Sequence, residues 1–285
     1  MFKIGAAMEK TPPYSVLMSL YHKENSACFE EALKSMIAQS AVPDEIVIVK
    51  DGPLTEELEG VLSKYTAEYP HLLRIVPLKE NVGLGRALAA GLKVCRNELV
   101  ARMDTDDIAD RRRCEKQLAC FMEDKDLAIV GSCICEFIDD PANIVSYRNV
   151  PEGHEELREY TKKRCPFNHM TVIFKKSEVE RAGGYLHWFY NEDYYLWIRM
   201  YLKNMKFRNL PDTLVNVRVG RDMYNRRGGV KYFKSEAALQ GYMLKNKVIS
   251  LPVYIVNVMK RLIVQVLLPG SIRGFVFKKF ARSSK

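Results

Sequence analysis

The fold of this chain is decided by one stretch, LVARMDTDD at residues 99–107, in which a short apolar run ends in three carboxylates within four residues. The apolar run predicts a buried strand. Asp104 and Asp106 alternate along the extended backbone, so a slight turn lets both carboxylates face one hard cation. Such oxygen ligands suit Mg²⁺ or Mn²⁺ with a bound diphosphate. The alternative is a solvated acidic turn that caps the following helix.

The chain has the composition of an ordinary globular protein: 285 residues, of which 47% are hydrophobic and 28% are charged. This length allows one large core, or one and a half domains. The seven cysteines form no Cys-x-x-Cys pair and follow no secretory signal, so we expect a reducing, cytoplasmic setting. Cys133 and Cys135 are expected at alternate positions of one strand rather than in a metal site.

The positive charge of the chain lies towards its C-terminal end. Residues 237–285 contain nine Lys and Arg and no Asp or Glu, which accounts for the whole net charge of +9. Residues 1–236 are therefore neutral overall. This pattern argues against a nucleic-acid-binding body and favours a cationic tail that meets an anionic surface.

The first hundred residues alternate between strand and helix patterns. Four strand–helix units in succession predict a parallel sheet with right-handed crossovers and helices on both faces. Buried apolar runs predict the strands, and helical spacing of apolar residues predicts the helices. The expected strands are 14–21, 45–50, 72–77 and 98–103, and the expected helices are 26–39, 54–66 and a third that opens within 81–87 and runs to about 94.

The C-terminal ends of these strands are expected to meet at one edge, where open α/β sheets bind ligands. At that edge Asp51 can accept a hydrogen bond from a base imide or a ribose hydroxyl, although a plain turn at 51–53 is the alternative. Gly83 and Gly85 permit close backbone approach, and Arg86 can approach a phosphate. The Gly-Leu-Gly sequence follows the third strand and lacks the third glycine of the dinucleotide fingerprint, which disfavours a dinucleotide-binding domain.

Several motifs, in order and spacing as well as in residues, resemble one known family. They are VIVKDG at 47–52, ENVGLG at 80–85 and MDTDD at 103–107, then Arg113 with EKQ at 115–117, NHMTV at 168–172, GGY at 183–185 and NEDYYLW at 191–197. About 14–220 resembles the family 2 glycosyltransferases of the GT-A fold. The chain looks most like the bacterial enzymes that build capsule and O-antigen repeat units.

The resemblance implies an α/β fold of the GT-A type, with a mixed sheet, helices on both faces and here a helical, basic C-terminal extension. In the family pattern Asp51 would bind the nucleobase, Asp104 the ribose or the metal, and Asp106 the metal, Mn²⁺ or Mg²⁺. Asp193 would be the catalytic base, with Glu192 beside it to orient. The other residues expected at the donor are Ser19, Tyr21, Glu24, Asn81, Gly83, Arg86 and Arg113.

The sequence departs from the family pattern in two places. KDGP at 50–53 replaces the commoner Asp-Asp-Gly-Ser. The Gln-x-x-Arg-Trp motif of the processive synthases is missing, which implies a single addition to each acceptor.

The acidic pair at the start of a predicted helix, Glu192 and Asp193, has a structural and a chemical interpretation. Acidic residues in a first helical turn complement the helix dipole. A sugar hydroxyl that attacks an anomeric carbon must also lose its proton, and a positioned carboxylate can accept it. Both interpretations stay open at this point.

Acceptor-side or lid residues are expected in the second half of the chain. His169 precedes an apolar strand over 170–174, where a structural hydrogen bond is the alternative to an acceptor contact. The arginine-rich loop 218–229 can close over the donor diphosphate or can be an exposed connector. The candidates are His169, Trp197, Arg218, Arg226 and Arg227.

The apolar stretch 251–268 is interrupted by Asn257, Lys260, Arg261 and Gln265, which share one narrow helical face. Two cations at its centre would cost about 2.5–3.5 kcal/mol each in a bilayer, which argues against a transmembrane helix. We expect a helix that lies on an anionic membrane surface, followed by a basic tail. The alternative is a helix packed against the catalytic domain with a loose tail.

The resemblance, taken with these features, implies a metal-dependent, inverting, non-processive glycosyltransferase that moves one hexose from a nucleotide sugar. A UDP-sugar is favoured, with a dTDP-sugar as the second choice. The acceptor that the resemblance implies is a glycan, lipid-linked through undecaprenyl diphosphate, at the inner face of the cytoplasmic membrane, and no nucleic-acid partner is expected. The expected domains are a catalytic domain at 1–220 (donor half 14–110, acceptor half 111–220) and a loop with a basic extension at 221–285.

Two other functions fit parts of the sequence. A catalytically inactive nucleotide- or glycan-binding module of the same fold is the alternative, but it would be expected to lose one of the two acidic pairs, and this chain has both. A nucleotidyltransferase usually needs a basic, glycine-rich loop after the first strand, where this chain has YHKE at 21–24.

Overall fold

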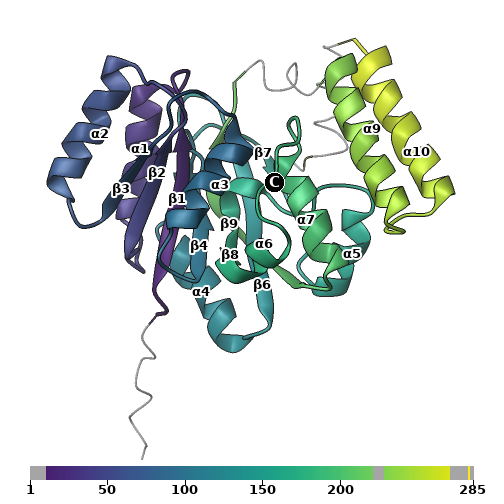
Figure 1. The fold of residues 1–285 in the computed structure, drawn as a ribbon, viewed down its shortest axis with the longest axis horizontal. Coiled ribbons are helices and arrows are strands. Elements are labelled where there is room, and N and C mark those ends of the chain that lie inside the picture. The colour runs from purple at the N-terminus through teal and green to yellow at the C-terminus, as the bar shows by residue number, and fades with distance from the viewer. Residues whose placement is uncertain (1–10, 221–227, 270–281, 283–285) are drawn as a thin grey trace, which may run out of the picture.

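Figure 1 shows the fold, in a computed structural model, as a sheet between layers of helices. The structure describes residues 11–220, 228–269 and 282. Within them nine strands form one mixed sheet, in the order β3-β2-β1-β4-β8-β6-β9-β5, with β7 paired to β6.

The first half of the sheet is parallel, as the alternation predicted. β1 (Tyr14–Leu20) lies between β2 (Glu45–Lys50) and β4 (Leu99–Arg102), and β3 (Leu73–Pro77) pairs with β2. The helices between these strands are α1 (Ser26–Ile37), α2 (Glu56–Glu68) and α3 (Leu84–Val94). The predicted strand and helix order is confirmed, and the predicted ends agree with the observed ones to within two residues.

The second half makes the sheet mixed. β8 (Ile173–Lys175) runs antiparallel to β4 and to β6 (Leu127–Phe137). β9 (Lys206–Arg218) runs parallel to β6 and antiparallel to β5 (Ile108–Ala109), while β7 (Ile144–Arg148) runs antiparallel to β6. The helices of this half are α4 (Arg113–Glu123), α5 (His154–Thr161), α6 (Lys176–Arg181) and α7 (Glu192–Leu202).

Two local expectations in this half can be compared directly. The strand expected over 170–174 begins at Ile173, because His169–Thr171 forms a short 3₁₀ helix, η1. Cys133 and Cys135 occupy alternate positions of β6 as expected, and all seven cysteines are free thiols.

Successive residues of β1 point to opposite faces of the sheet and so build two apolar cores. Val16 and Met18 pack with residues of α1, α2 and α4, whereas Leu17 packs with residues of α3, α6 and α7. Because both faces are covered, polar side chains that bind a ligand are restricted to the ends of the strands.

Two further helices, α9 (Val230–Lys245) and α10 (Leu251–Leu262), lie side by side beyond α7 and α5 (Figure 1). Leu239 and Met243 of α9 pack against Tyr194 and Ile198 of α7. The sequence analysis did not anticipate α9, because its apolar residues are spread around the helix and give a weak helical pattern. α10 continues into a π-helical turn, η2 (Ile263–Leu267).

The amphipathic segment formed by α10 and η2 has its polar side inward. Asn257 and Gln265 are only 6% and 5% exposed, whereas Ile255, Met259 and Leu267 are 51%, 49% and 66% exposed. The segment therefore packs against the rest of the protein through its polar face, and its apolar face is open. No helix of the described residues has the length and apolar content needed to cross a bilayer.

The structure also corrects the role of one cation of the tail. Arg282 belongs to the basic stretch 237–285, which was expected to meet an anionic surface. Its Nε instead donates to Glu136 Oε1 at 2.7 Å, in an ion pair whose side chains are 4% and 2% exposed. Arg282 therefore compensates a buried carboxylate of β6 and cannot contribute to an exposed cationic patch. Lys278 and Lys279 lie outside the described residues.

Candidate active site

Asp51 shapes the loops at the C-terminal ends of β2 and β3. Its two carboxylate oxygens accept hydrogen bonds from the backbone N–H groups of Val82 (2.7 Å) and Gly83 (3.1 Å). Gly52 has a φ of +88°, and a Cβ there would lie 2.7 Å from the backbone nitrogen of Asn81. The side-chain amide of Asn81 donates to the Asp51 carbonyl at 3.2 Å. These two loops, which the sequence analysis expected to converge, are therefore in direct contact.

The end of β1 contacts the aspartate segment through Thr105. Its hydroxyl lies 3.5 Å from the carbonyl oxygen of Ser19. Tyr21 and Glu24 follow in a turn closed by the Glu24 N–H, which donates to the Tyr21 carbonyl at 3.1 Å. Arg86 is exposed in the first turn of α3. These residues follow the parallel strands at the same edge of the sheet, and their contact with a donor stays a prediction.

Three carboxylates gather directly after β4. Oxygen atoms of Asp104, Asp106 and Asp107 all lie within 4.8 Å of one another, an arrangement that fits one metal ion. Asp107 is buried, and burial together with the charges of Asp106 and Asp104 raises its pKa well above the usual range. Its Oδ1 accepts from the Arg218 N–H at 2.9 Å, whereas Oδ2 has no hydrogen-bond partner among the described residues. A divalent cation would relieve this repulsion.

Asp107 is a candidate metal ligand that the sequence analysis did not assign, although it lies in the same acidic run. Arg102 is a second missed residue. It is fully buried at the end of β4 and forms an ion pair with Asp104. Its Nε and Nη1 atoms have no hydrogen-bond partner among the described residues, so two buried donors are available to a bound anion. An arginine inside an otherwise apolar strand is the sequence signal that could have identified it.

The acidic pair of α7 lies across from these aspartates. A Cβ on Gly85 in α3 would lie 3.0 Å from the Cβ of Glu192, so the first turns of α3 and α7 approach closely. Burial and the neighbouring charge of Asp193 raise the pKa of Glu192 from 4.5 to about 7. The Asp104 carboxylate raises that pKa as well, so the two acidic groups interact electrostatically.

Asp193 points in a different direction from Glu192. Its Oδ1 accepts from the Tyr194 N–H at 2.7 Å, and its Oδ2 accepts from the Cys165 thiol at 3.6 Å. It lines a cavity between α7, α9 and α10, which Glu192 does not. Burial raises the pKa of Asp193, so its carboxylate is more basic than an ordinary aspartate. The two acidic residues therefore face different surroundings. Glu192 lies near α3 and Asp104, whereas Asp193 lies at the cavity.

Residues 15–180 match a family model described as glycosyl transferase family 2. The chain belongs to this family. An uncharacterised glycosyltransferase of Haemophilus influenzae is 47% identical over 223 residues, which are 78% of this chain and 82% of that protein. The amylovoran biosynthesis glycosyltransferase AmsE of Erwinia amylovora is 42% identical over 81% of this chain and 85% of its own. This protein is therefore a glycosyltransferase.

A third relative is similar along nearly the whole chain. The UDP-Gal:α-D-GlcNAc-diphosphoundecaprenol β-1,3-galactosyltransferase of Escherichia coli is 37% identical over 274 residues, 96% of this chain and 98% of that enzyme. The match extends beyond the family model, so it includes residues of α9 and α10.

Solved glycosyltransferase structures share the fold. The mannosyltransferase PcManGT of Pyrobaculum calidifontis, in complex with GDP-Man and Mn²⁺, has a TM-score of 0.65 at 17% identity and covers 96% of this chain and 76% of its own. The Staphylococcus aureus TarS fragment 1–349 with UDP-GlcNAc has a TM-score of 0.64 at 17% identity. The match covers 94% of this chain and 76% of the TarS fragment. The predicted GT-A fold is confirmed.

Two residues expected at the ligands of this glycosyltransferase lie in its core instead. Arg113 is fully buried in α4, where it donates to Gln117 at 3.1 Å and to the Arg102 carbonyl at 2.6 Å. Arg113 therefore holds the backbone of β4 from within the core and is not placed at the donor. Trp197 is also fully buried, and its ring packs edge-on against Phe167 with 5.5 Å between the ring centres, so its indole belongs to the core.

The remaining acceptor or lid candidates divide into three cases. His169 is 8% exposed, and its Nε2 lies 2.9 Å from the Tyr185 hydroxyl, the structural hydrogen bond that was its alternative role. Arg218 lies at the end of β9, where it pairs with Glu31 at 2.5 Å and donates to the Asp106 carbonyl at 3.3 Å. It anchors the aspartate segment rather than a lid. Arg226 and Arg227 lie outside the described residues.

Proposed function

We propose that this glycosyltransferase moves one hexose from a nucleotide sugar, with UDP favoured over dTDP, to a lipid-linked glycan acceptor with inversion at the anomeric carbon. The observation that carries the proposal is the opposition of two acidic sets at one edge of the sheet. Asp104, Asp106 and Asp107 lie together on one side, and Glu192 with Asp193 lies across from them. The relative of E. coli, named for UDP-Gal and a diphosphoundecaprenol acceptor, supports both substrate classes.

The three aspartates would hold a divalent cation, Mn²⁺ or Mg²⁺. The fit rests on the chemistry of the donor set: three oxygen ligands within reach of one another, one of them a buried carboxylate oxygen without a partner among the described residues. When bound, the cation would neutralise the charge that develops on the leaving nucleoside diphosphate. The two available N–H groups of Arg102 would donate to the same diphosphate or to the transferred sugar.

Asp51 and the loop around Gly83 would hold the nucleoside. Each carboxylate oxygen of Asp51 already accepts one backbone hydrogen bond and retains a lone pair for the imide N–H of uracil or thymine. Cytosine and purines do not offer that donor in the same geometry. A preference for uracil or thymine would therefore follow from one acceptor group held by its loop.

Asp193 would be the general base. An acceptor hydroxyl in the neighbouring cavity would give its proton to Asp193 as its oxygen attacks the anomeric carbon. The attack comes from the side opposite the nucleoside diphosphate, so a single displacement inverts the configuration. Glu192 would orient the donor sugar from the side of α3, since its raised pKa leaves part of it protonated and able to donate a hydrogen bond.

The exposed apolar face of α10 and η2 would hold the enzyme at a membrane surface. Six large apolar residues are open on it: Leu251, Ile255, Val256, Met259, Ile263 and Leu267. Most follow one another at intervals of four residues, the spacing of a single helical face. A contiguous exposed apolar patch usually marks an interaction surface, and a lipid-linked acceptor is confined to the bilayer.

The experiment that tests the function is a transfer assay. Purified protein is incubated with single UDP-, dTDP- and GDP-sugars, Mn²⁺ or Mg²⁺, and synthetic sugar diphosphate lipids, and products are detected by mass spectrometry. We expect transfer from one UDP- or dTDP-sugar, loss of transfer in excess EDTA, and a β-linked product from an α-linked donor. Transfer that persists in EDTA, or an α-linked product, would contradict the metal role or the inversion respectively.

A further inference from the structure

A cavity of about 760 Å³ lies between the start of α7, the segment after α5 and the helices α9 and α10. This is the volume of a small-molecule site. Asp193 and Cys165 line it, so the cavity opens beside the proposed base. Nothing in the donor site described above uses this space, because the aspartate cluster, Asp51 and the loop around Gly83 do not line it.

The lining of the cavity is strongly cationic. Six basic residues line it, against the carboxylates of Asp193 and Glu236: Arg148, Lys163, Arg164, Lys260, Arg261 and Arg282. Two of the six are already paired, Arg261 with Glu236 and Arg282 with Glu136. For Lys163, Arg164 and Lys260, no carboxylate of the described residues lies within ion-pair distance. The cavity therefore has an excess of positive charge that an anionic ligand can neutralise.

Arg164 is the cation most affected by this environment. Burial lowers its pKa, and the neighbouring guanidinium groups of Arg148, Arg282 and Arg261 lower it further. Its guanidinium lies over the face of Tyr160, 5.9 Å from the ring centre. A half-buried guanidinium that faces other guanidinium groups gains more from a bound anion than an exposed one does.

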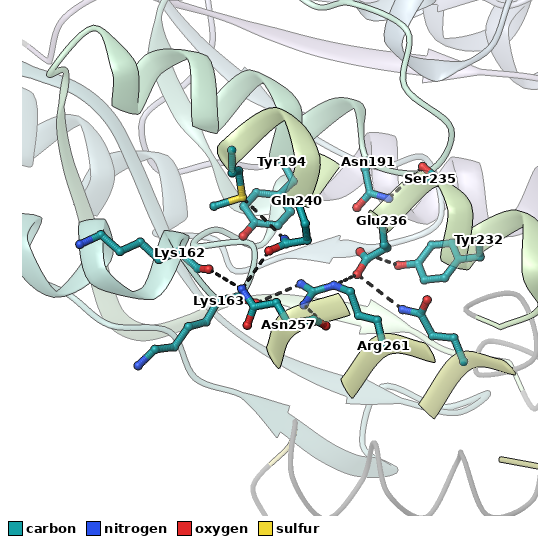
Figure 2. A network of polar contacts seen from close by, with 12 residues as sticks. Lys162, Lys163, Asn191, Tyr194, Tyr232, Ser235, Glu236, Gln240, Asn257 and Arg261 are labelled. Atoms are coloured by element: carbon teal, nitrogen blue, oxygen red, sulfur yellow. Dashed lines mark hydrogen bonds and ion pairs between the residues drawn. The ribbon is translucent and has the colours of Figure 1, made fainter. Parts of the chain in front are cut away.

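The polar face of α10 holds this cationic segment in place, as Figure 2 shows. Asn257 donates to the Lys162 carbonyl (2.9 Å) and to Gln240 of α9 (2.8 Å), and Arg261 donates to the Lys163 carbonyl (3.0 Å). Glu236 of α9 points at Arg261 in the same network. The inward polar face therefore fixes the backbone directly before Arg164 and Cys165.

The cavity also has an apolar wall that leads outward. Pro252, Val253, Val256 and Val264 line it from α10 and η2. Val256 is 48% exposed and belongs to the open apolar face of the same helix. A hydrocarbon chain that leaves the cavity over Val256 thus passes directly onto the surface proposed to meet the membrane.

We propose that this cavity binds the diphosphate of a polyprenyl-diphosphate-linked acceptor, with the sugar towards Asp193, the diphosphate on Arg164, Lys163 and Lys260, and the prenyl chain over Val256. The assignment rests on the proposed function. It gives α9 and α10 a role in acceptor recognition, because they supply both the apolar wall and the contacts that hold the cationic segment.

Binding of farnesyl diphosphate in EDTA tests the assignment without any sugar. EDTA removes the metal that a diphosphate would need at the aspartate site, so only a metal-free anion site is measured. By calorimetry we expect the wild type to bind farnesyl diphosphate about tenfold more tightly than farnesyl monophosphate, and Arg164→Gln to weaken it about 10- to 100-fold. Lys203→Gln, at an exposed cation beyond the far end of α7, is the matched control and should bind as the wild type does.

The double variant Lys163→Gln/Lys260→Gln guards against misfolding, because both side chains are exposed. It should also lose affinity while its melting temperature stays within a few degrees of the wild type. Equal binding by the wild type and both pocket variants would overturn the assignment. Displacement of farnesyl diphosphate by uridine in EDTA would do so too, because uridine has no phosphate and would locate the ligand at the nucleoside site.

Failure of the assignment can be separated from failure of the proposed function. If the wild type transfers sugar to a diphosphate lipid but Arg164→Gln has the same KM for that acceptor, the function holds and the cavity assignment is wrong. If the wild type transfers no sugar in the full donor screen, the function is wrong, whatever the binding experiment gives.

Discussion

Gly85 of α3 and Glu192 of α7 approach so closely that a Cβ on the glycine would lie 3.0 Å from the Cβ of the glutamate and 3.2 Å from the Leu186 carbonyl oxygen. The donor loop and the acidic pair are thereby held together, although they are more than a hundred residues apart in the sequence. The position of the proposed base, Asp193, thus depends on residue 85 being a glycine, which has no side chain to push α7 away.

Gly85→Ala should push the start of α7 away by a few tenths of an ångström and lower kcat several-fold, less than the about 10²-fold that a shift of about 1 Å can cost. Gly60→Ala is the control, because a Cβ in that part of α2 meets nothing within 4 Å. It should keep full activity and gain slightly in stability. The measurement is steady-state transfer with thermal unfolding of both variants. Full activity of Gly85→Ala would show that the contact is not needed for catalysis.

Asp106→Ala and Asp107→Asn should each abolish metal-dependent transfer, because each removes one charged oxygen ligand from the cluster. The stabilisation of the protein by UDP with Mn²⁺, seen in its melting temperature, should fall in parallel. Asp126→Asn, at an exposed aspartate outside the cluster, is the control and should respond to UDP and Mn²⁺ as the wild type does. An Asp107→Asn enzyme with normal metal affinity would remove Asp107 from the site.

Asp193→Asn should lower turnover by about 10²–10⁴-fold while donor binding persists, as expected for loss of a general base. The base is active when deprotonated, so kcat/KM should fall as the pH is lowered. Because burial raises the pKa of Asp193, that fall should begin above the range of an ordinary aspartate. A pH profile of the wild type measures this limb, and unchanged turnover in Asp193→Asn would assign the proton to another acceptor.

Glu192→Gln should stabilise the metal-free protein at pH 8. The folded-state pKa of Glu192 is raised from 4.5 to about 7, so the folded protein binds its proton more tightly than the unfolded chain does. Stability from this group is therefore present below pH 4.5 and is lost as the pH rises towards 7. Removing the charge should raise Tm at pH 8 by about 2–4 °C for each kcal/mol of repulsion relieved.

The pH dependence supplies the control for this prediction. Near pH 4.5 the glutamate is protonated in the folded state, so wild type and Glu192→Gln should unfold at similar temperatures. Melting curves of both proteins at four or five pH values between about 4.5 and 8 measure whether the difference in Tm grows with pH. A difference in Tm that does not change with pH would point to packing rather than charge.

The double variant Ile255→Glu/Ile263→Glu should lose binding to vesicles that contain anionic lipid, because it puts two charges on the open apolar face of α10 and η2. Val42→Glu is the matched control, since Val42 is 68% exposed but lies between α1 and β2. Sedimentation with vesicles at low and high salt measures the effect. If the wild-type protein does not sediment with anionic vesicles at low salt, the membrane proposal is wrong.

The sequence alone was sufficient to predict the parallel half of the sheet and to identify the family. Strands such as 45–50 are continuous apolar runs, and the loops after them carry short motifs, so each feature is encoded within a few adjacent residues. Their convergence follows from the topology of a parallel sheet. Asp51, Asp104 and Asp106 could therefore be assigned as candidates before any coordinates, as could the residues of β1 that build the core, whereas Asp193 was assigned from the resemblance to the family.

Only the tertiary structure could decide which polar residues face a ligand and which support the core. Arg102 and Arg113 are both arginines near the aspartate run, yet two donor atoms of Arg102 have no partner within the described part of the chain, whereas Arg113 donates to Gln117 and to the Arg102 carbonyl. Local sequence carries no information on which long-range partner satisfies a buried charge. Asp107 differs from its neighbours in the same way, through a contact with Arg218 from the far end of β9.

The orientation of α10 shows this division most clearly. The sequence determined that Asn257, Arg261 and Gln265 share one face of a helix and that its other face is apolar, because helical periodicity is local. It could not determine which face is buried. That was decided by carbonyl groups after α5 and by Glu236 and Gln240 of α9, which provide hydrogen-bond partners for the polar face. A polar side chain is buried where its partners are, and those partners come from other parts of the chain.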